Sequence, residues 1–397
     1  MAREVLTDRE GKATGVSYVD KTDMQEYQVE GRTVILAASA CESARLLLNS
    51  KSDRHPNGLA NNSDVVGRYL HDSTGASVSG VLPQLFDRKR YNEDGVGGMH
   101  VYTPWWGDNK KLDFPRGYHI EYGGGQGMPA YGFGWGIENT NGKHLVHGKQ
   151  KEAGGYGKSL KEDYRFFYGA GVNMAGRGEA IPLYENRCTI DENVVDRYGI
   201  PVLKFDVKWT DHEIKQAKHM KETFKEIMHN MGAIITSGGN DDASNNWGLS
   251  KPGQIIHEAG TVRMGNDPKK SALNKHNQAH DCKNLFVVDG SAFVSQADKN
   301  ITWTILALSM RASEYIVDQL KKNTNAVKMY TWYIEPDAKI SQPYWLEYQK
   351  EKGSFNVNDQ QLIGKAENDP LSVNFSVMIE DKEFIFTQPV WYKYTDP

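Results

Sequence analysis

Residues 254–265 read Gln-Ile-Ile-His-Glu-Ala-Gly-Thr-Val-Arg-Met-Gly, and two further informative segments follow them closely. The first is Asn-Leu-Phe-Val-Val-Asp-Gly-Ser at 284–291, an apolar run typical of a buried strand that ends in Asp289 and Gly290. The second is Asn300-Ile301-Thr302, which begins a helical pattern that extends to about Leu320. We expect the three segments to fold into one ligand site.

His257 is the candidate base of this site. Oxidation of an alcohol removes a proton from the hydroxyl group and a hydride from the carbon. A neutral imidazole accepts a proton near pH 7, because its unperturbed pKa is about 6.5. The chain has twelve histidines, so an isolated histidine is weak evidence for a base. His257 stands out because it lies in an apolar, glycine-containing stretch before the predicted strand.

The strand end and the helix start are the candidate cofactor side of the site. Asp289 and Gly290 place a carboxylate and a bare backbone where a ligand can approach, although a plain turn would use the same residues. The helix from Thr302 is apolar in its first two turns, so we expect its N-terminus to be buried with unpaired N–H groups. Asn300 could cap this helix or donate a hydrogen bond to the substrate oxygen.

The N-terminal region predicts a small antiparallel meander over residues 3–36, followed by a helix from Cys41 to about Asn49. Glu42 lies in the first turn of that helix, where the helix dipole favours a negative charge. The strand, the small residues 37–40 and the helix would let a cofactor approach the backbone.

The middle of the chain, about 80–205, is rich in Gly, Tyr and Trp and predicts an antiparallel sheet with long loops. Aromatic residues there could line a sugar pocket or fill a β core; they are Trp105, Trp106, Tyr131 and Trp135. An amphipathic helix follows, with a capping box at Thr210–Glu213 and an end at Gly232. We expect His219 and His229 on its exposed face to have no chemical role.

The tail predicts a β-hairpin, because Leu371, Val373, Phe375, Val377 and Ile379 alternate strictly before a turn at Asp381-Lys382 and a second strand at 384–386. Two strands do not fold alone, so this hairpin would begin a β-sandwich-like module.

Charge and cysteine usage exclude several classes of protein. The net charge of -4, from 47 basic and 51 acidic residues, favours no nucleic acid or anionic membrane as a partner. The three cysteines (Cys41, Cys188 and Cys282) predict buried, reduced thiols. No apolar run approaches the ~18 residues of a transmembrane segment. Without an export signal the chain would be cytoplasmic as written.

Two other patterns are weaker. His276, His280 and Cys282 have a spacing compatible with zinc, but Asn277 and Gln278 favour a hydrogen-bonded turn. Residues 125–130 fit a dinucleotide fingerprint by letter, but Tyr-Gly-Phe-Gly at 131–134 cannot begin a helix, so we reject it.

The motifs together resemble the glucose-methanol-choline (GMC) family of flavin oxidoreductases over about residues 1–320. The segments 196–201 (Asp-Arg-Tyr-Gly-Ile-Pro) and 209–211 (Trp-Thr-Asp) are similar to its gluconate, fructose and sorbitol dehydrogenase branch. The resemblance implies FAD as cofactor, His257 as proton acceptor and Asn300 in place of a second histidine. It places Asp289, Gly290, Ile301 and Thr302 along the flavin, and Ala38 to Glu42 near the adenosine. An alcohol or sugar would be the substrate, and a quinone, a cytochrome or oxygen the electron acceptor.

The chain also departs from the family pattern. Asn300-Ile301-Thr302 stands where the family has Asn-Pro-Thr, and Ser39 stands where it has glycine and could crowd the cofactor. The strand–turn–helix that holds the adenosine diphosphate is missing, so we expect an N-terminally truncated chain. Relatives are often exported to the periplasm. The tail bears a weaker likeness, at 340–346 and 392–397, to a β-rich module of some zinc-dependent deacetylases.

The expected fold class is therefore α/β (α+β), divided into four regions. These are an FAD-domain segment at 1–79, an antiparallel substrate domain at 80–250, a C-terminal FAD-domain segment at 251–322, and a linker with a partial β-rich module at 323–397. The expected function is FAD-dependent oxidation of a CH–OH group in a sugar, polyol or sugar acid. The alternative is a truncated, non-catalytic fragment or carbohydrate-binding protein that cannot hold FAD.

Overall fold

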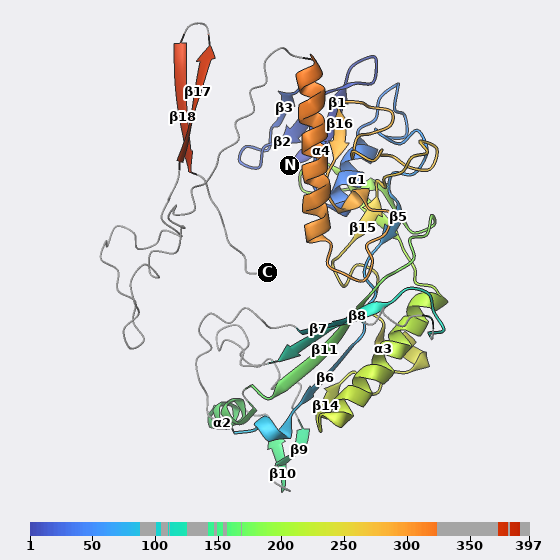
Figure 1. Ribbon diagram of the computed structural model, residues 1–397, viewed down its shortest axis with the longest axis vertical. Coiled ribbons are helices and arrows are strands. Elements are labelled where there is room, and N and C mark those ends of the chain that lie inside the picture. Colours follow the sequence, from blue (N-terminus) through green and yellow to red (C-terminus); the bar gives the residue numbers. More distant parts are fainter. Residues whose placement is uncertain are drawn as a thin grey trace, which may run out of the picture. The chain divides into compact units, whose positions relative to one another are not determined.

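The computed structural model describes residues 1–87, 101–104, 110, 112–124, 142–146, 149–153, 157–167, 169–323, 372–379 and 382–389. The chain divides into two compact units, Met1–Asn323 and Thr324–Pro397 (Figure 1). Several sequence expectations lie outside the described residues: the four aromatic residues of the possible sugar pocket, the rejected fingerprint at 125–130, and the tail segments at 340–346 and 392–397.

The N-terminal strands form the predicted meander, with one correction. Strands β1 (Ala2–Thr7), β2 (Ala13–Val19) and β3 (Glu26–Glu30) pair antiparallel in that order, as predicted. Strand β4 (Val34–Leu36) does not continue this sheet; it pairs parallel with β16 (Leu285–Val287). The physical reason is burial, because β4 and β16 are both short apolar runs; β16 is wholly buried, and β4 buries Val34 and Leu36 beside it.

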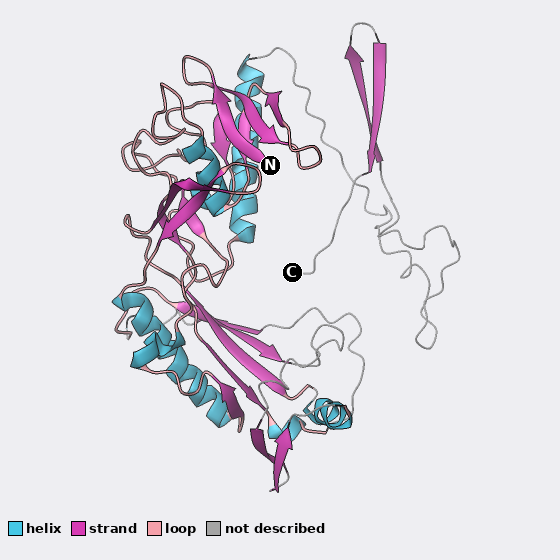
Figure 2. Ribbon diagram, turned by 180° about the vertical axis from the view of Figure 1, so that it is seen from behind, coloured by secondary structure: helices cyan, strands magenta, loops and turns pink. Residues whose placement is uncertain are grey.

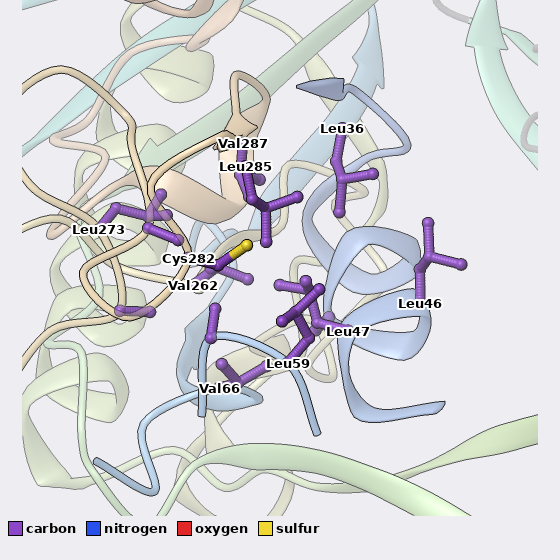
Figure 3. Close-up of a cluster of buried hydrophobic side chains, with 14 of the residues drawn as sticks. Leu36, Leu46, Leu47, Leu59, Val66, Val262, Leu273, Cys282, Leu285 and Val287 are labelled. Carbon is purple, nitrogen blue, oxygen red and sulfur yellow. The ribbon is translucent and has the colours of Figure 1, made fainter. Parts of the chain in front are cut away.

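The core of the first unit surrounds this parallel pair. Helix α1 (Ala40–Asn49), predicted from Cys41, turns its buried residues towards it. Figure 3 shows Leu47 and Leu59 close to Leu285 and Val287 in this cluster. Each such side chain contributes about 1.5–3 kcal/mol when it is fully buried. The core thus joins residues near the N-terminus to the segment that carries Asp289.

A second sheet has five antiparallel strands. Their order is β14 (Ile234–Ser237), β6 (Ser77–Val81), β11 (Gly171–Gly178), β8 (Tyr118–Gly124) and β7 (Val101–Pro104). Helix α3 (Asp211–Asn230) covers one face of this sheet (Figure 2). Its capping box at Thr210 and Glu213 is present as predicted. Position 176 favours glycine, because a Cβ atom there would overlap Met220 Sδ.

The expectation for His219 is wrong in one respect. His229 is exposed, but His219 is half-buried and its Nδ1 lies 2.8 Å from the Tyr118 hydroxyl oxygen. Its ring also meets Phe114 edge-on at 5.7 Å. Burial lowers the pKa of His219. The helix is therefore covered over a wider arc than its apolar stripe indicates.

A four-stranded sheet carries the histidine motif. Its order is β13 (Pro201–Asp206), β12 (Arg187–Val195), β5 (Arg68–His71) and β15 (Ala259–Thr261). These strands come from three of the four regions expected from the sequence. The boundaries at 79/80 and 250/251 therefore do not coincide with sheet boundaries.

Helix α4 (Thr302–Asn323) packs against β16 through its second half, where Ala312 and Ile316 meet Phe286 and Val288. Among the described residues, no helix has the length and apolarity needed to cross a bilayer. The remaining elements of the first unit are β9 (Gly142–Val146), β10 (Lys149–Ala153), α2 (Lys158–Phe167) and short 3-10 turns at Pro83–Leu85, Ala243–Gly248 and Gly290–Ala292.

In the second unit, β17 (Ser372–Ile379) and β18 (Lys382–Pro389) pair antiparallel with Phe375 opposite Phe386. This pairing confirms the two strands of the predicted hairpin. The mixed α/β class with antiparallel sheets is confirmed as well. All three cysteines are free thiols; Cys188 and Cys282 are buried as expected, but Cys41 is only half-buried.

His71, at the end of β5, is a neutral histidine in the interior. Its Nδ1 donates to the Tyr69 carbonyl at 2.8 Å, and its side chain is almost fully covered. Burial lowers the pKa of His71 from 6.5 to about 4; the hydrogen bond to Tyr69 opposes this shift and the charge of Arg263 adds to it. Between these two pH values the unfolded chain binds more protons than the folded chain.

Acid should therefore destabilise the fold through His71. Stability from this group is complete above pH 6.5 and is lost as the pH falls to about 4, by an amount on the order of 3 kcal/mol. Urea unfolding between pH 7 and pH 4 measures this loss. His71→Gln should flatten the pH dependence, whereas His229→Gln, an exposed control, should keep it. Parallel curves for the wild type and His71→Gln would contradict the assignment.

Candidate active site

The three segments selected from the sequence meet at Gly290. A Cβ atom on Gly290 would lie 3.3 Å from the Glu258 carbonyl oxygen and 3.3 Å from Ile301 Cδ1. Ala259, Phe293 and Ile301 form one buried apolar cluster. The structure thus brings together the residues next to His257, the end of β16 and the start of α4, as the sequence predicted. The roles of the individual side chains stay predictions.

Asp72 holds the loop that carries His257. This buried carboxylate accepts the backbone N–H groups of Gly253 at 3.1 Å, Ile255 at 3.2 Å and His257 at 2.9 Å, and also that of Ser73 at 2.8 Å. Hydrogen bonds to an ionised acceptor are about twice as strong as neutral ones. The position of the His257 backbone therefore depends on a residue at the end of β5.

The His257 side chain is half-buried and its two ring nitrogens differ. Nδ1 is enclosed by protein and has no hydrogen-bond partner among the described residues. An enclosed Nδ1 is out of reach of a substrate. Nε2, by contrast, is not among the enclosed and unpartnered side-chain atoms of the described residues. The Gln296 amide supports this loop, because in its favourable orientation it donates to the His257 carbonyl at 2.7 Å and accepts from the Ser73 N–H at 3.0 Å.

The Gly-Thr pair of the motif is structural. Gly260 has φ +83°, and a side chain there would overlap the Tyr69 carbonyl and approach His71 Nδ1 to 3.0 Å. Thr261 donates its hydroxyl to the carbonyl of Ala40, in the first turn of α1, at 2.5 Å. These contacts fix β15 against β5 and α1.

Asp289 uses its carboxylate inside the protein. One oxygen accepts from the Ser43 hydroxyl at 2.5 Å, and the other accepts from the Ser291 N–H at 2.9 Å and hydroxyl at 2.6 Å. Asp289 thereby caps the short turn at Gly290–Ala292 and ties it to α1. Its predicted place near a cofactor is compatible with this position, but its side chain has a structural task of its own.

The small residues before α1 are exposed, as a cofactor surface requires. Ala38 and Ser39 are both exposed, and Ser39 has φ +89°, a backbone region that favours glycine. The glycine that the sequence resemblance implies at this position would adopt this conformation without strain. Glu42 is exposed and pairs with Arg45 at 3.2 Å; Arg45 also binds Asp196 at 2.8 Å.

The expected burial of the α4 N-terminus is wrong. Ile301 is buried and its carbonyl accepts the N–H of Ile305 at 2.9 Å, but Asn300 and Thr302 are exposed. The side chains of Trp303 and Leu306 are 74% and 57% exposed. The apolar first two turns predict a buried N-terminus, whereas in this part of the helix the described protein meets the stripe that includes Ile301 and Ile305.

Two polar residues near the site were missed from the sequence, Asp72 and His119. His119 Nδ1 donates to the carbonyl of Asp298, two residues before Asn300. His119 lies on β8, so this hydrogen bond connects the five-stranded sheet to the segment before α4. The contacts that tie them to the site, His119 with Asp298 and Asp72 with His257, join residues more than 170 positions apart in the sequence, so no local pattern marks them.

The possible zinc cluster folds as the hydrogen-bonded turn that the sequence favoured. Asn274 Oδ1 accepts the N–H of His276 at 2.8 Å, and its amide donates to Gln278 at 2.9 Å. The His276 ring stacks on Tyr315 with centroids 4.0 Å apart. His280 Nε2 lies 3.1 Å from both Ser271 Oγ and the Gly265 carbonyl.

Comparisons with known proteins agree on one family. A model described as GMC oxidoreductase matches residues 182–309, and a second model with the same description matches residues 1–74. The 2-methyl-1,2-propanediol dehydrogenase of Mycolicibacterium austroafricanum is 30% identical over 317 residues, 79% of this chain and 52% of that protein. The fructose dehydrogenase large subunit of Gluconobacter japonicus is 28% identical over 317 residues, 80% and 52% of the two chains. The chain thus spans about half the length of these relatives.

Solved structures share the fold. A formate oxidase of Aspergillus oryzae RIB40, from a study of its FAD modification, aligns with a TM-score of 0.55 at 14% identity. The alignment covers 81% of this chain and 60% of that chain. The likeness concerns the arrangement of helices and strands alone.

Replacement of Asp72 by asparagine tests the role of its carboxylate. Asp72→Asn removes one acceptor oxygen and points an NH₂ group at N–H donors, so we expect a loss of about 2 to 4 kcal/mol of unfolding free energy. Urea unfolding measures this loss, and hydrogen exchange should show faster exchange at residues 253–257.

Asp113→Asn serves as the control, because Asp113 is exposed and lies 3.8 Å from Lys215. Its stability should change by less than about 0.5 kcal/mol. Unchanged exchange at residues 253–257 in Asp72→Asn would show that the carboxylate does not hold the loop.

Proposed function

The chain belongs to the GMC oxidoreductase family, and on this premise we propose that it forms the substrate-binding and proton-transferring part of an FAD-dependent oxidoreductase. The reaction would oxidise a CH–OH group of a sugar, a polyol or a sugar acid. The observation that carries the proposal is the meeting of the His257 segment, the end of β16 and the start of α4 at Gly290.

The relatives support the substrate class and the cofactor. Their names refer to the oxidation of a propanediol and of fructose, which are both polyhydroxylated. FAD is the cofactor expected of this family, and the similar formate oxidase is described with it. The alternative of a non-catalytic carbohydrate-binding fragment has no support from these relatives, since both are dehydrogenases.

The described residues fit FAD on two sides of the site. Ala38 and Ser39 are small and exposed, so a ligand can reach their backbone. Thr302 is exposed at the start of α4, where the first N–H groups of a helix have no partner within the helix and favour negative charge. These residues, together with Gly290 and Ile301, would hold the cofactor. When bound, FAD supplies an acceptor for the hydride of the carbinol carbon.

His257 would take the proton of the hydroxyl group. Its Nδ1 is enclosed, so the proton goes to Nε2. Asp72 fixes the backbone on one side and Gln296 on the other, which keeps the ring in place during the transfer. The exposed amide of Asn300 would donate to the substrate oxygen as negative charge develops there. Hydride and proton thus leave the same carbinol on separate paths.

A visible absorption spectrum tests the proposal. The chain is purified after expression with FAD supplied, and its spectrum is recorded before and after anaerobic addition of 2-methyl-1,2-propanediol, fructose or gluconate. Bound flavin that one of these alcohols bleaches is the expected result. A protein without flavin, or a flavin that none of them bleaches, would refute the proposal.

Loss of the His257 imidazole should slow the reaction without loss of cofactor. We expect His257→Ala to lower the rate of flavin bleaching by about 10² to 10⁴, the contribution of a positioned base. The ratio of flavin to protein should stay at the wild-type value. His229→Ala, on the exposed face of α3, is the matched control and should bleach at the wild-type rate. Equal rates in both variants would remove His257 from its role.

A further inference from the structure

Ile256 has a backbone conformation that is unfavourable for its residue type. Its φ is +60°, in the left-handed region, where a β-branched side chain is a genuine outlier. Its side chain is 76% exposed, although the residue stands directly before His257. An isoleucine here has the strain of the conformation without the benefit of burial.

Its neighbours show how the conformation is held. Asp72 accepts the N–H groups of Ile255 and His257, on either side of Ile256. Ile255 points inward, since a Cβ on Gly75 would lie 2.8 Å from its Cδ1. The packing in this loop is therefore done by Ile255, and Ile256 is turned the other way.

A glycine or an asparagine at position 256 would suit the fold better. Both adopt φ near +60° at lower cost, and neither would leave an apolar side chain in water. Strain of this kind persists where the surrounding structure enforces it and is concentrated at sites of function. The fold alone gives no reason for isoleucine at this position.

Other exposed apolar residues stand on the segments that meet at Gly290. Val294 is 46% exposed and directly follows Phe293 of the buried cluster. Trp303 is 74% exposed and stands two residues after Ile301 of the same cluster. The segments that meet at Gly290 thus carry exposed aliphatic and aromatic surface in addition to polar groups.

We propose that Ile256 is a specificity-determining residue that contacts the carbon substituent next to the carbinol. Such a contact favours an alcohol with an aliphatic group beside the reacting hydroxyl, such as a branched 1,2-diol, over a fully hydroxylated sugar. This inference rests on the proposed function and narrows its substrate class. It assigns no chemical step to Ile256.

The test compares Ile256→Gly and Ile256→Ala with the wild-type holoprotein. Both remove the apolar contact, so the KM for 2-methyl-1,2-propanediol should rise about tenfold, while the KM for fructose should change less than about threefold. The Ile256→Gly variant should also unfold at a higher temperature than the wild type, because glycine relieves the strain. The rise in unfolding temperature is a readout that does not depend on turnover.

Met24→Gly is the matched control. Met24 has φ +61°, is 48% exposed and lies in the turn between β2 and β3, far along the chain from His257. Its replacement should raise the unfolding temperature in the same way and leave both KM values unchanged.

Four results would overturn the inference. An unchanged KM for the diol in both variants would show that Ile256 does not contact the substrate. An equal rise for diol and fructose removes the preference for an aliphatic substituent. Loss of FAD from the variants places Ile256 against the cofactor instead of the substrate. A wild-type protein that holds FAD but is bleached by no alcohol refutes the proposed function itself, and the inference with it.

Discussion

The buried carboxylate of Asp72 is the constraint on which the site depends. It stands at the end of a short strand, and four backbone N–H groups converge on it. Because three of those groups belong to Gly253, Ile255 and His257, one side chain sets the path of the whole loop. The same clamp turns Ile255 inward, leaves Ile256 exposed in a strained conformation, and presents the His257 ring with one nitrogen enclosed.

Near Asp72, some residues of the family motif hold the fold together and others are available for chemistry. Gly260 and Thr261 lock β15 to β5 and α1, and Asp289 locks the end of β16 to α1 through Ser43. These residues build the frame. His257 and Asn300 are the polar groups that we propose for contact with the substrate. Most motif residues make contacts that position the surrounding strands and α1. A short stretch of sequence can therefore specify the whole site.

The sequence predicted the elements better than their partners. Periodicity and caps identify β16, α3 and the C-terminal hairpin, because burial of alternate residues and a capping box leave local signals. The parallel pairing of β4, by contrast, depends on a strand about 250 positions away. Asp72 gives no signal in its own neighbourhood. The apolar first two turns of α4 predict a buried N-terminus, although only the stripe with Ile301 and Ile305 is covered there. The candidate site was predicted through its motif and not through the residue that holds it.

The exposed side of α4 has a consequence for the polypeptide in solution. Trp303, Leu306 and Met310 recur at helical spacing, and each leaves more than half of its side chain in water. Each forgoes most of the roughly 1.5–3 kcal/mol that full burial would give. Exposed apolar patches of this kind promote self-association. Concentrated samples of the isolated chain therefore have a built-in tendency to aggregate along this helix, which detergents or a charged residue on the stripe would suppress.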